Sequence, residues 1–223
     1  MPTALVIGAS RGIGREFARQ LVQDGWKTYA TARDAAALDA LRTEGAEPLK
    51  LDVAKPESLA ALGWQLDGVK LDLVLYVAGL LGPQQDASEP PNAADFDAVM
   101  HTNVLGAMQV TPLLGPLVEA AAGLFVFVTS GMGSIAESAE SGPWWLYRVS
   151  KAALNMAVKS AAFDYPKATF VAMCPGWVQT DMGGPNATTP VDVCVSDMRR
   201  VLTTLKRGDS GIYINHAGRV LPW

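Results

Sequence analysis

The sequence predicts an α/β fold in which a doubly wound parallel sheet of about seven strands carries helices on both faces. Three observations lead to this fold class. Short runs that are apolar on both faces recur along the chain, stretches with helical periodicity separate them, and a glycine-rich turn follows the first run. Buried strands that are joined through helices are typical of parallel sheets with right-handed crossovers.

The predicted elements alternate along the whole chain. Short apolar runs are predicted as strands at Ala4–Ile7, Lys27–Thr31, Pro48–Leu51, Leu71–Val77, Leu124–Thr129, Thr169–Met173 and Gly211–Ile214. Amphipathic stretches are predicted as helices at Ile13–Asp24, Asp34–Glu44, Glu57–Leu66, Ala93–Val110, Trp145–Phe163 and Val191–Lys206. Segments rich in glycine, proline and polar residues are expected to be surface loops at Leu81–Asn92, Gly131–Pro143 and Gly183–Pro190.

Length and composition are those of a globular protein. The chain has 223 residues, 49% of them apolar and 18% charged, and residues 1–223 are expected to form a single domain. A domain of this length buries roughly 70–75% of its unfolded surface, so neither a disulfide nor a metal is needed for its core. Cys174 and Cys194 are interpreted as buried or half-buried thiols.

Charge and hydropathy limit the classes of partner. The net charge is −4 and the chain has no basic patch, so no nucleic-acid partner is expected. No stretch of 18 apolar residues occurs, so no membrane span is expected. The first residues lack the pattern of a signal peptide, and the expected location is therefore the cytoplasm.

The first predicted strand runs directly into Gly8-Ala9-Ser10-Arg11-Gly12-Ile13-Gly14, and a helix follows. Glycine allows a sharp turn and the close approach of a pyrophosphate, and a helix N-terminus offers free N–H groups and a positive dipole end. The spacing differs from the commonest dinucleotide pattern, Gly-x-Gly-x-x-Gly. Its position between a strand and a helix nevertheless favours a Rossmann-like dinucleotide site over a plain turn.

The end of the second strand bears on the choice of cofactor. A carboxylate there would bind the ribose 2′-hydroxyl of NAD, but this strand ends with Thr31 and is followed by Arg33. Arg11 in the glycine turn offers a second guanidinium, a group that suits phosphate. We therefore predict NADP(H) in preference to NAD(H); the alternative is that both arginines are ordinary solvated surface groups.

Two further strand ends are expected near the cofactor. Asp52-Val53 closes the third strand, where the aspartate can cap the next turn, accept from an adenine amino group, or do both. Ala78-Gly79 closes the fourth strand, where the backbone must pass close to the cofactor. His101 and His216 are isolated, with no spacing typical of metal ligands, so no metal site is proposed.

Tyr147 and Lys151 are four positions apart in a predicted helix, so both side chains lie on one helix face. A nearby cation favours a phenolate and lowers the pKa of a tyrosine from about 10. Such a tyrosine can act as a general acid or base. A chance pairing on a helix surface is the alternative, and the other motifs of the chain outweigh it.

These motifs stand in the order and setting of one family: Gly8-x-x-x-Gly12-x-Gly14, Asp52-Val53, Ala78-Gly79, Asn103, Ser130, Tyr147-x-x-x-Lys151 and Pro175-Gly176. The chain resembles the short-chain dehydrogenases/reductases over nearly its whole length. Within that family, the segment Cys174-Pro175-Gly176-Trp177-Val178-Gln179-Thr180-Asp181-Met182-Gly183-Gly184 and the final Leu221-Pro222-Trp223 are similar to the sniffer-type carbonyl reductases and the bacterial C-factor proteins.

The resemblance implies a catalytic tetrad. Tyr147 would be the acid/base, and Lys151 would hold the nicotinamide ribose and lower the pKa of Tyr147. Ser130 would hydrogen-bond the substrate oxygen, and Asn103 would hold a water that connects Lys151 to solvent. Thr180 would touch the carboxamide or the phosphates. The full set of predicted cofactor contacts is Gly8, Ser10, Arg11, Gly12, Ile13, Gly14, Arg33, Asp52, Val53, Ala78, Gly79, Tyr147, Lys151, Pro175, Gly176, Val178 and Thr180.

The chain departs from the family pattern in three places. Tyr76-Val77 stands where the family often has two asparagines, and Ile7 precedes the glycine turn where threonine is common. The gap between Ser130 and Tyr147 is longer than usual, which leaves Ser134 and Ser138 as rivals to Ser130. Ser130 is favoured because it ends a strand, where doubly wound sheets bind their ligands.

These inferences predict an NADP-dependent oxidoreductase that acts on a small carbonyl or alcohol substrate. The alternative is a regulatory or signalling protein of the C-factor kind, in which turnover is slow or incidental. Trp144, Trp145 and Trp177 either line an apolar substrate pocket or pack in the core or an interface. The family often pairs through the helix with the Tyr and Lys, so a homodimer or homotetramer is an open alternative to a monomer.

Overall fold

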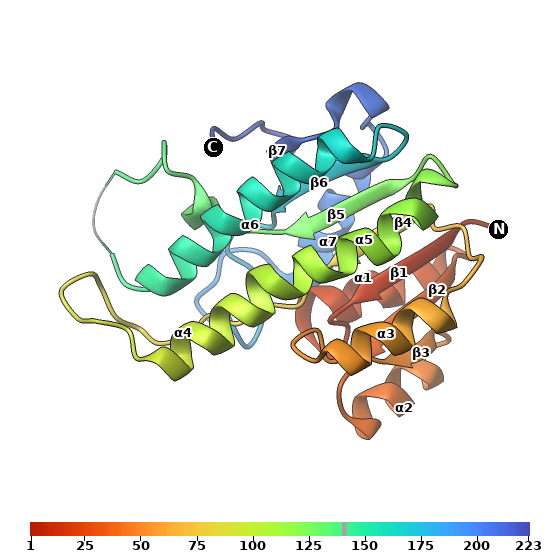
Figure 1. Ribbon diagram of the computed structural model, residues 1–223, viewed down its shortest axis with the longest axis horizontal. Helices are drawn as coiled ribbons and strands as arrows, with labels where there is room; N and C mark the ends of the chain where they lie inside the picture. Colours follow the sequence, from red (N-terminus) through yellow and green to blue (C-terminus); the bar gives the residue numbers. More distant parts are fainter. Residues whose placement is uncertain (140–141) are drawn as a thin grey trace.

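The computed structural model describes residues 1–139 and 142–223. Their strands form one parallel sheet in the order β3-β2-β1-β4-β5-β6-β7, with helices on both faces (Figure 1). The predicted fold class is therefore confirmed. The strands are β1 (Thr3–Ile7), β2 (Lys27–Ala32), β3 (Glu47–Lys50), β4 (Leu73–Tyr76), β5 (Leu124–Val128), β6 (Thr169–Cys174) and β7 (Ile212–Asn215).

The helices form two layers against the sheet. One core cluster joins the sheet to α3 (Pro56–Gln65), α5 (Gly106–Glu119) and α6 (Trp145–Asp164). A second cluster joins the opposite face to α1 (Gly12–Gln23), α2 (Ala35–Thr43) and α7 (Val191–Leu202). Successive residues of a strand belong alternately to the two clusters, because their side chains point to opposite faces of the sheet. In Figure 1, α5 and α6 lie in front of the sheet, α1 lies behind it, and α4 (Ala93–Met100) continues the line of α5 to the lower left.

The predicted helix Ala93–Val110 is longer and less regular than expected. It consists of α4, a π-helical turn at His101–Leu105, and α5, which continues through Pro112 and Pro116. The predicted end at Val110 is wrong because proline usually stops a helix by removing an amide donor. Both prolines lie on the exposed face of α5, where water can reach the carbonyls that lack a partner.

The predicted helix Val191–Lys206 is shorter than expected. The helix α7 ends at Leu202, where the hydroxyls of Thr203 and Thr204 donate to the carbonyls of Arg200 and Val201. Such local bonds compete with helix propagation. Among residues 1–139 and 142–223, no helix combines the length and the apolar character that a membrane span needs.

Candidate active site

The turn after β1 contains glycines at positions where other backbone segments of the protein come too close for a side chain. Gly8 has φ +90°, and a Cβ on it would lie 2.7 Å from the amide nitrogen of Ala78. A Cβ on Gly14 would lie 2.2 Å from the carbonyl oxygen of Gly8. Thr31 at the end of β2 holds the turn, since its hydroxyl accepts from the Gly8 amide at 3.1 Å. The backbone is therefore folded into a tight loop at the carboxyl edge of the sheet.

The N-terminus of α1 follows this turn and suits a phosphate group. Arg11 is the N-cap residue in an extended conformation, and within the described chain no side chain caps the first amides of α1. Ser10, Arg11, Gly12 and Ile13 line the adjoining cleft. Free amides at a helix N-terminus, together with the helix dipole, form an anion site. The residues present therefore fit the pyrophosphate of a dinucleotide.

Two arginines reach the same cleft from different elements. Arg33, after β2, is exposed and lines the cleft. Arg11 also lines it but donates to the carboxylate of Asp181 at 2.9 Å, and both partners are more than two-thirds exposed. An ion pair that is this exposed contributes little to stability, so a phosphate could displace Asp181. Asp52 and Val53 line the cleft as well, and the Asp52 carboxylate caps its turn by accepting from the Ala54 amide at 3.1 Å.

Tyr147 and Lys151 lie in the first half of α6, both are buried, and both line the cleft. The Lys151 ammonium nitrogen is 5.5 Å from the centroid of the Tyr147 ring, so the two side chains do share one helix face. The same ammonium donates to the carbonyl of Val128, the last residue of β5, at 2.9 Å. The sheet edge and α6 therefore fix the Lys151 head group together.

Ser130 lies two residues after the end of β5, and its hydroxyl accepts from the Met132 amide at 3.2 Å. A hydrogen bond with Ser130 acts on the Tyr147 hydroxyl and lowers its pKa. The rival Ser134 has other partners, because its hydroxyl donates to the Pro222 carbonyl at 2.7 Å and accepts from the Glu137 amide. The other rival, Ser138, is exposed, and its hydroxyl accepts from the Arg148 guanidinium at 3.4 Å. Ser130 is therefore the serine beside Tyr147. Part of the predicted loop Gly131–Pro143, residues 140 and 141, lies outside the described residues.

Asn103 lies in the π-helical turn and is fully buried. Its Oδ1 accepts from the Leu80 amide at 2.7 Å, and its Nδ2 donates to the Leu80 carbonyl and to the Ser150 hydroxyl, both at 2.9 Å. A Cβ on Gly79 would lie 3.4 Å from Asn103 Oδ1 and 3.6 Å from Lys151 Nζ. Asn103 therefore ties the segment after β4 to α6 beside the Lys151 ammonium.

Burial dominates the protonation of the pair. It raises the pKa of Tyr147 to about 12, against the smaller opposing effect of the Ser130 hydrogen bond. It lowers the pKa of Lys151 to about 8, because the buried ammonium has lost its hydration. The net pKa of Tyr147 thus lies above its ordinary value, and the predicted lowering of this pKa by Lys151 stays a prediction. The Lys151 ammonium is hydrogen-bonded to the Val128 carbonyl and lies against the Tyr147 ring.

The cleft collects most of the predicted cofactor contacts, but some lie behind its surface. Gly14 packs under the turn, and Gly176, with φ +80°, packs against His216. Val178 is buried and forms a β-bridge with Thr189. Sequence reasoning missed other lining residues, whose only signal was their position next to predicted ones: Leu80, Thr102, Val128, Thr129, Asp181 and Met182.

The three tryptophans are not part of this cleft as the described residues form it. Trp177 is 54% exposed and its indole N–H donates to the Gly183 carbonyl at 2.8 Å. Trp145 is the first residue of α6 and is 36% exposed, and Trp144 precedes it with φ +71°. Their predicted contribution to a substrate pocket stays a prediction.

Comparison with known proteins identifies the family of the chain. The family described as short chain dehydrogenase matches residues 2–190. The C-signal of Myxococcus xanthus is 43% identical over 58% of this chain and 80% of its own length. A structure from Burkholderia multivorans with bound NADP is 36% identical with a TM-score of 0.90, covering 100% of this chain and 99% of that one. The NADPH-bound carbonyl reductase from chicken fatty liver is 30% identical with a TM-score of 0.90 and the same coverage.

Proposed function

The chain belongs to the short-chain dehydrogenases, and we propose that it is an NADP(H)-dependent oxidoreductase for a small carbonyl/alcohol pair. The observation that carries this proposal is that the buried Tyr147 and Lys151 line the same cleft as the glycine turn at the N-terminus of α1. One cleft thus combines an anion-binding turn with a proton-transfer pair. Cofactors of this class supply the hydride, while the protein supplies position and charge.

In the proposed reduction, Tyr147 gives its hydroxyl proton to the substrate oxygen. A pKa of about 12 keeps that hydroxyl protonated at neutral pH, so the proton to be donated is in place. The Ser130 hydroxyl donates a second hydrogen bond to the developing oxyanion. The Lys151 ammonium then stabilises the phenolate that remains, and Asn103 supports the backbone beside it. The substrate oxygen would thus meet two donors from different segments, Ser130 in the turn after β5 and Tyr147 on α6.

The remaining cleft residues would hold the cofactor. We assign the pyrophosphate to the Ser10–Ile13 amides and the adenosine to the Asp52-Val53 side of the cleft. Ala78 and Gly79 would let the cofactor approach β4, and Pro175, Gly176, Val178 and Thr180 would shape the nicotinamide end. The preference for NADP(H) rests on Arg33 and Arg11, which reach the cleft as cations, and relatives with bound NADP support it.

A second function is a signalling protein that senses a dinucleotide. It is supported by the C-signal relative from Myxococcus xanthus. The two proposals differ in turnover, because a sensor needs tight cofactor binding without rapid hydride transfer. The protein should be mixed with NADPH and a panel of aliphatic and aromatic aldehydes and ketones while NADPH absorbance is followed. Consumption of NADPH with at least one carbonyl supports the enzyme, whereas tight binding without consumption supports the sensor.

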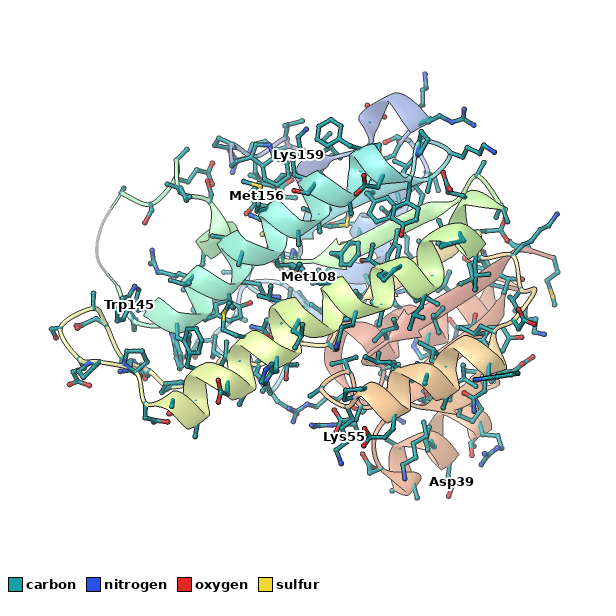
Figure 2. All side chains as sticks on the ribbon, in the orientation of Figure 1. Asp39, Lys55, Met108, Trp145, Met156 and Lys159 are labelled. Atoms are coloured by element: carbon teal, nitrogen blue, oxygen red, sulfur yellow. The ribbon has the colours of Figure 1, made fainter. Side chains whose placement is uncertain are left out.

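The partner in solution would be a second copy of the chain. Apolar side chains stand out from neighbouring helices: Met108 of α5 is 55% exposed, and Val149 and Met156 of α6 are 43% and 66% exposed. Figure 2 shows Met108 and Met156 on the same side of the molecule. We propose a homodimer through this face, which sedimentation would test: Met156→Glu should shift a dimer to monomer, and a wild-type monomer would contradict the proposal.

A further inference from the structure

Tyr213 makes a contact that links the last strand to the candidate site. Its side chain is 1% exposed on β7, and its hydroxyl donates to the backbone carbonyl of Ser130 at 2.6 Å. In the sheet order, β6 lies between β7 and the β5 strand that precedes Ser130. The Tyr213 side chain therefore reaches across β6 to bond the backbone of Ser130.

The sheet register explains how the tyrosine reaches so far. Tyr213 pairs with Ala172 of β6, and Ala172 pairs with Phe127 of β5. Residues in register on neighbouring strands face the same side of the sheet. The short side chain of Ala172 leaves room for the Tyr213 ring to cross β6. Cys174 lies two residues further on the same face, and its sulfur accepts from the Gly131 amide at 3.0 Å.

The Ser130 carbonyl has left the sheet and is held by other partners. The ladder with β6 continues to Thr129, whose amide donates to the Met173 carbonyl at 2.8 Å. The next carbonyl, that of Ser130, accepts from the Gly133 amide at 2.9 Å as well as from Tyr213. The hydroxyl of Tyr213 is thus the long-range partner of the Ser130 carbonyl, at the start of the turn.

Asn155 of α6 holds the two flanks of this turn. Its Oδ1 accepts from the Thr129 hydroxyl at 2.7 Å, and its Nδ2 donates to the Gly133 carbonyl at 3.3 Å. The ring of Tyr213 is itself stacked on Trp223, with centroids 5.2 Å apart. The turn that contains Ser130 is therefore held by Tyr213 of β7 and by Asn155 of α6 in one hydrogen-bonded network.

We propose that Tyr213 is a positioning residue for Ser130. Its hydroxyl fixes the Ser130 backbone and so keeps the Ser130 hydroxyl beside that of Tyr147. This inference rests on the proposed carbonyl reduction, in which Ser130 donates to the substrate oxygen. Tyr213 acts only through Ser130, because its hydrogen bond ends on the backbone carbonyl of that residue.

The first test measures the anchor without relying on activity. Tyr213→Phe keeps the ring and removes the hydroxyl, and Tyr29→Phe on β2 is the matched control in another part of the sheet. We expect amide hydrogen exchange at Gly133 to become about fivefold faster in the first variant and to stay unchanged in the second. Unchanged exchange at Gly133 in Tyr213→Phe would overturn the inference, whatever the protein catalyses.

The second test measures the effect on the reaction through a double-mutant cycle. Tyr213→Phe should lower kcat about tenfold while leaving the KM for NADPH unchanged. In a Ser130→Ala background, the same change should have no further effect, because Tyr213 then has no hydroxyl to position. Losses that multiply in the double variant would overturn the inference. If the wild type reduced no carbonyl, the proposed function would fail, and the exchange experiment alone would decide whether Tyr213 anchors the turn.

Discussion

The two ends of the cleft are organised in different ways. At the proposed phosphate end, the turn and the start of α1 come from one continuous stretch, Gly8 to Gly14, and the constraint is steric. At the proposed catalytic end, side chains from distant parts of the chain are held by hydrogen bonds. Ser130 is anchored by Tyr213, and Asn103 is bonded to Leu80 and Ser150. One end depends on the absence of side chains, and the other depends on a network of them.

The two ends also differ in the exposure of their charged and titratable groups. The cations at the phosphate end are exposed, so solvent weakens their interactions and a ligand can rearrange them. Tyr147 and Lys151 are buried, so desolvation shifts both pKa values far from their ordinary range. We infer that the phosphate end adapts to the cofactor, whereas the catalytic end is organised before the cofactor binds.

The largest effect is expected from Gly14→Ala. The new Cβ would lie 2.2 Å from the Gly8 carbonyl oxygen, so the turn must open. We expect destabilisation by about 1–3 kcal/mol and the loss of measurable NADPH binding. Gly63→Ala on α3 is the control, since its nearest neighbour would be Leu113 at 3.9 Å. Fluorescence titration and thermal unfolding measure both changes, and wild-type NADPH affinity in Gly14→Ala would show that the turn is not the phosphate site.

Lys151→Met tests whether the Lys151 ammonium is desolvated, through the pH dependence of the free energy of unfolding. The pKa of Lys151 is lowered from 10.5 to about 8, so between these values the unfolded chain binds the proton more tightly than the folded one. Stability therefore rises with pH across this window, by roughly 3 kcal/mol at most for this one group. Urea unfolding of both proteins should show that the variant lacks this rise. An equal pH dependence in wild type and variant would mean that Lys151 is not desolvated.

Arg33→Ala should change the choice of cofactor more than the stability. Loss of a guanidinium from the ribose 2′-phosphate should weaken NADPH binding about tenfold and leave NADH binding unchanged. Arg42→Ala is the matched control, because Arg42 pairs with Asp39 on α2. Calorimetric titration with both dinucleotides measures the two constants. Equal losses for NADPH and NADH would place the effect of Arg33 elsewhere than at the 2′-phosphate.

Asp181→Asn should give the smallest effect and the opposite sign. It frees Arg11 from an exposed ion pair, so NADPH should bind up to about fivefold more tightly. The same titration measures it, with NADH as the comparison. Weaker NADPH binding would instead show that Asp181 serves to hold the turn in place.

The contrast between the two ends also explains what the sequence could predict. The glycine turn was predictable because steric demands on the backbone appear directly as glycine spacing. The Tyr147 and Lys151 face was predictable because helix periodicity places them together. The anchors Tyr213 and Asn155 were not, since their partners lie on other elements and nothing near them in the sequence marks the contact.

One departure from the family pattern has a structural counterpart. Tyr76 stands where an asparagine is common, and its hydroxyl donates to the Thr102 carbonyl in the π-helical turn at 2.6 Å. The buried Tyr76 side chain thus makes a polar contact with this turn from inside the core. Only the three-dimensional placement of β4 against that turn reveals this contact.

The account depends most directly on the turnover of Tyr147→Phe. With a carbonyl that the wild type reduces, the variant should bind NADPH with the wild-type Kd and consume it about 100- to 10,000-fold more slowly. That result would show that the hydroxyl serves the chemistry and that the cleft is otherwise intact. A variant that consumes NADPH at the wild-type rate would contradict the assignment of Tyr147 as the proton donor.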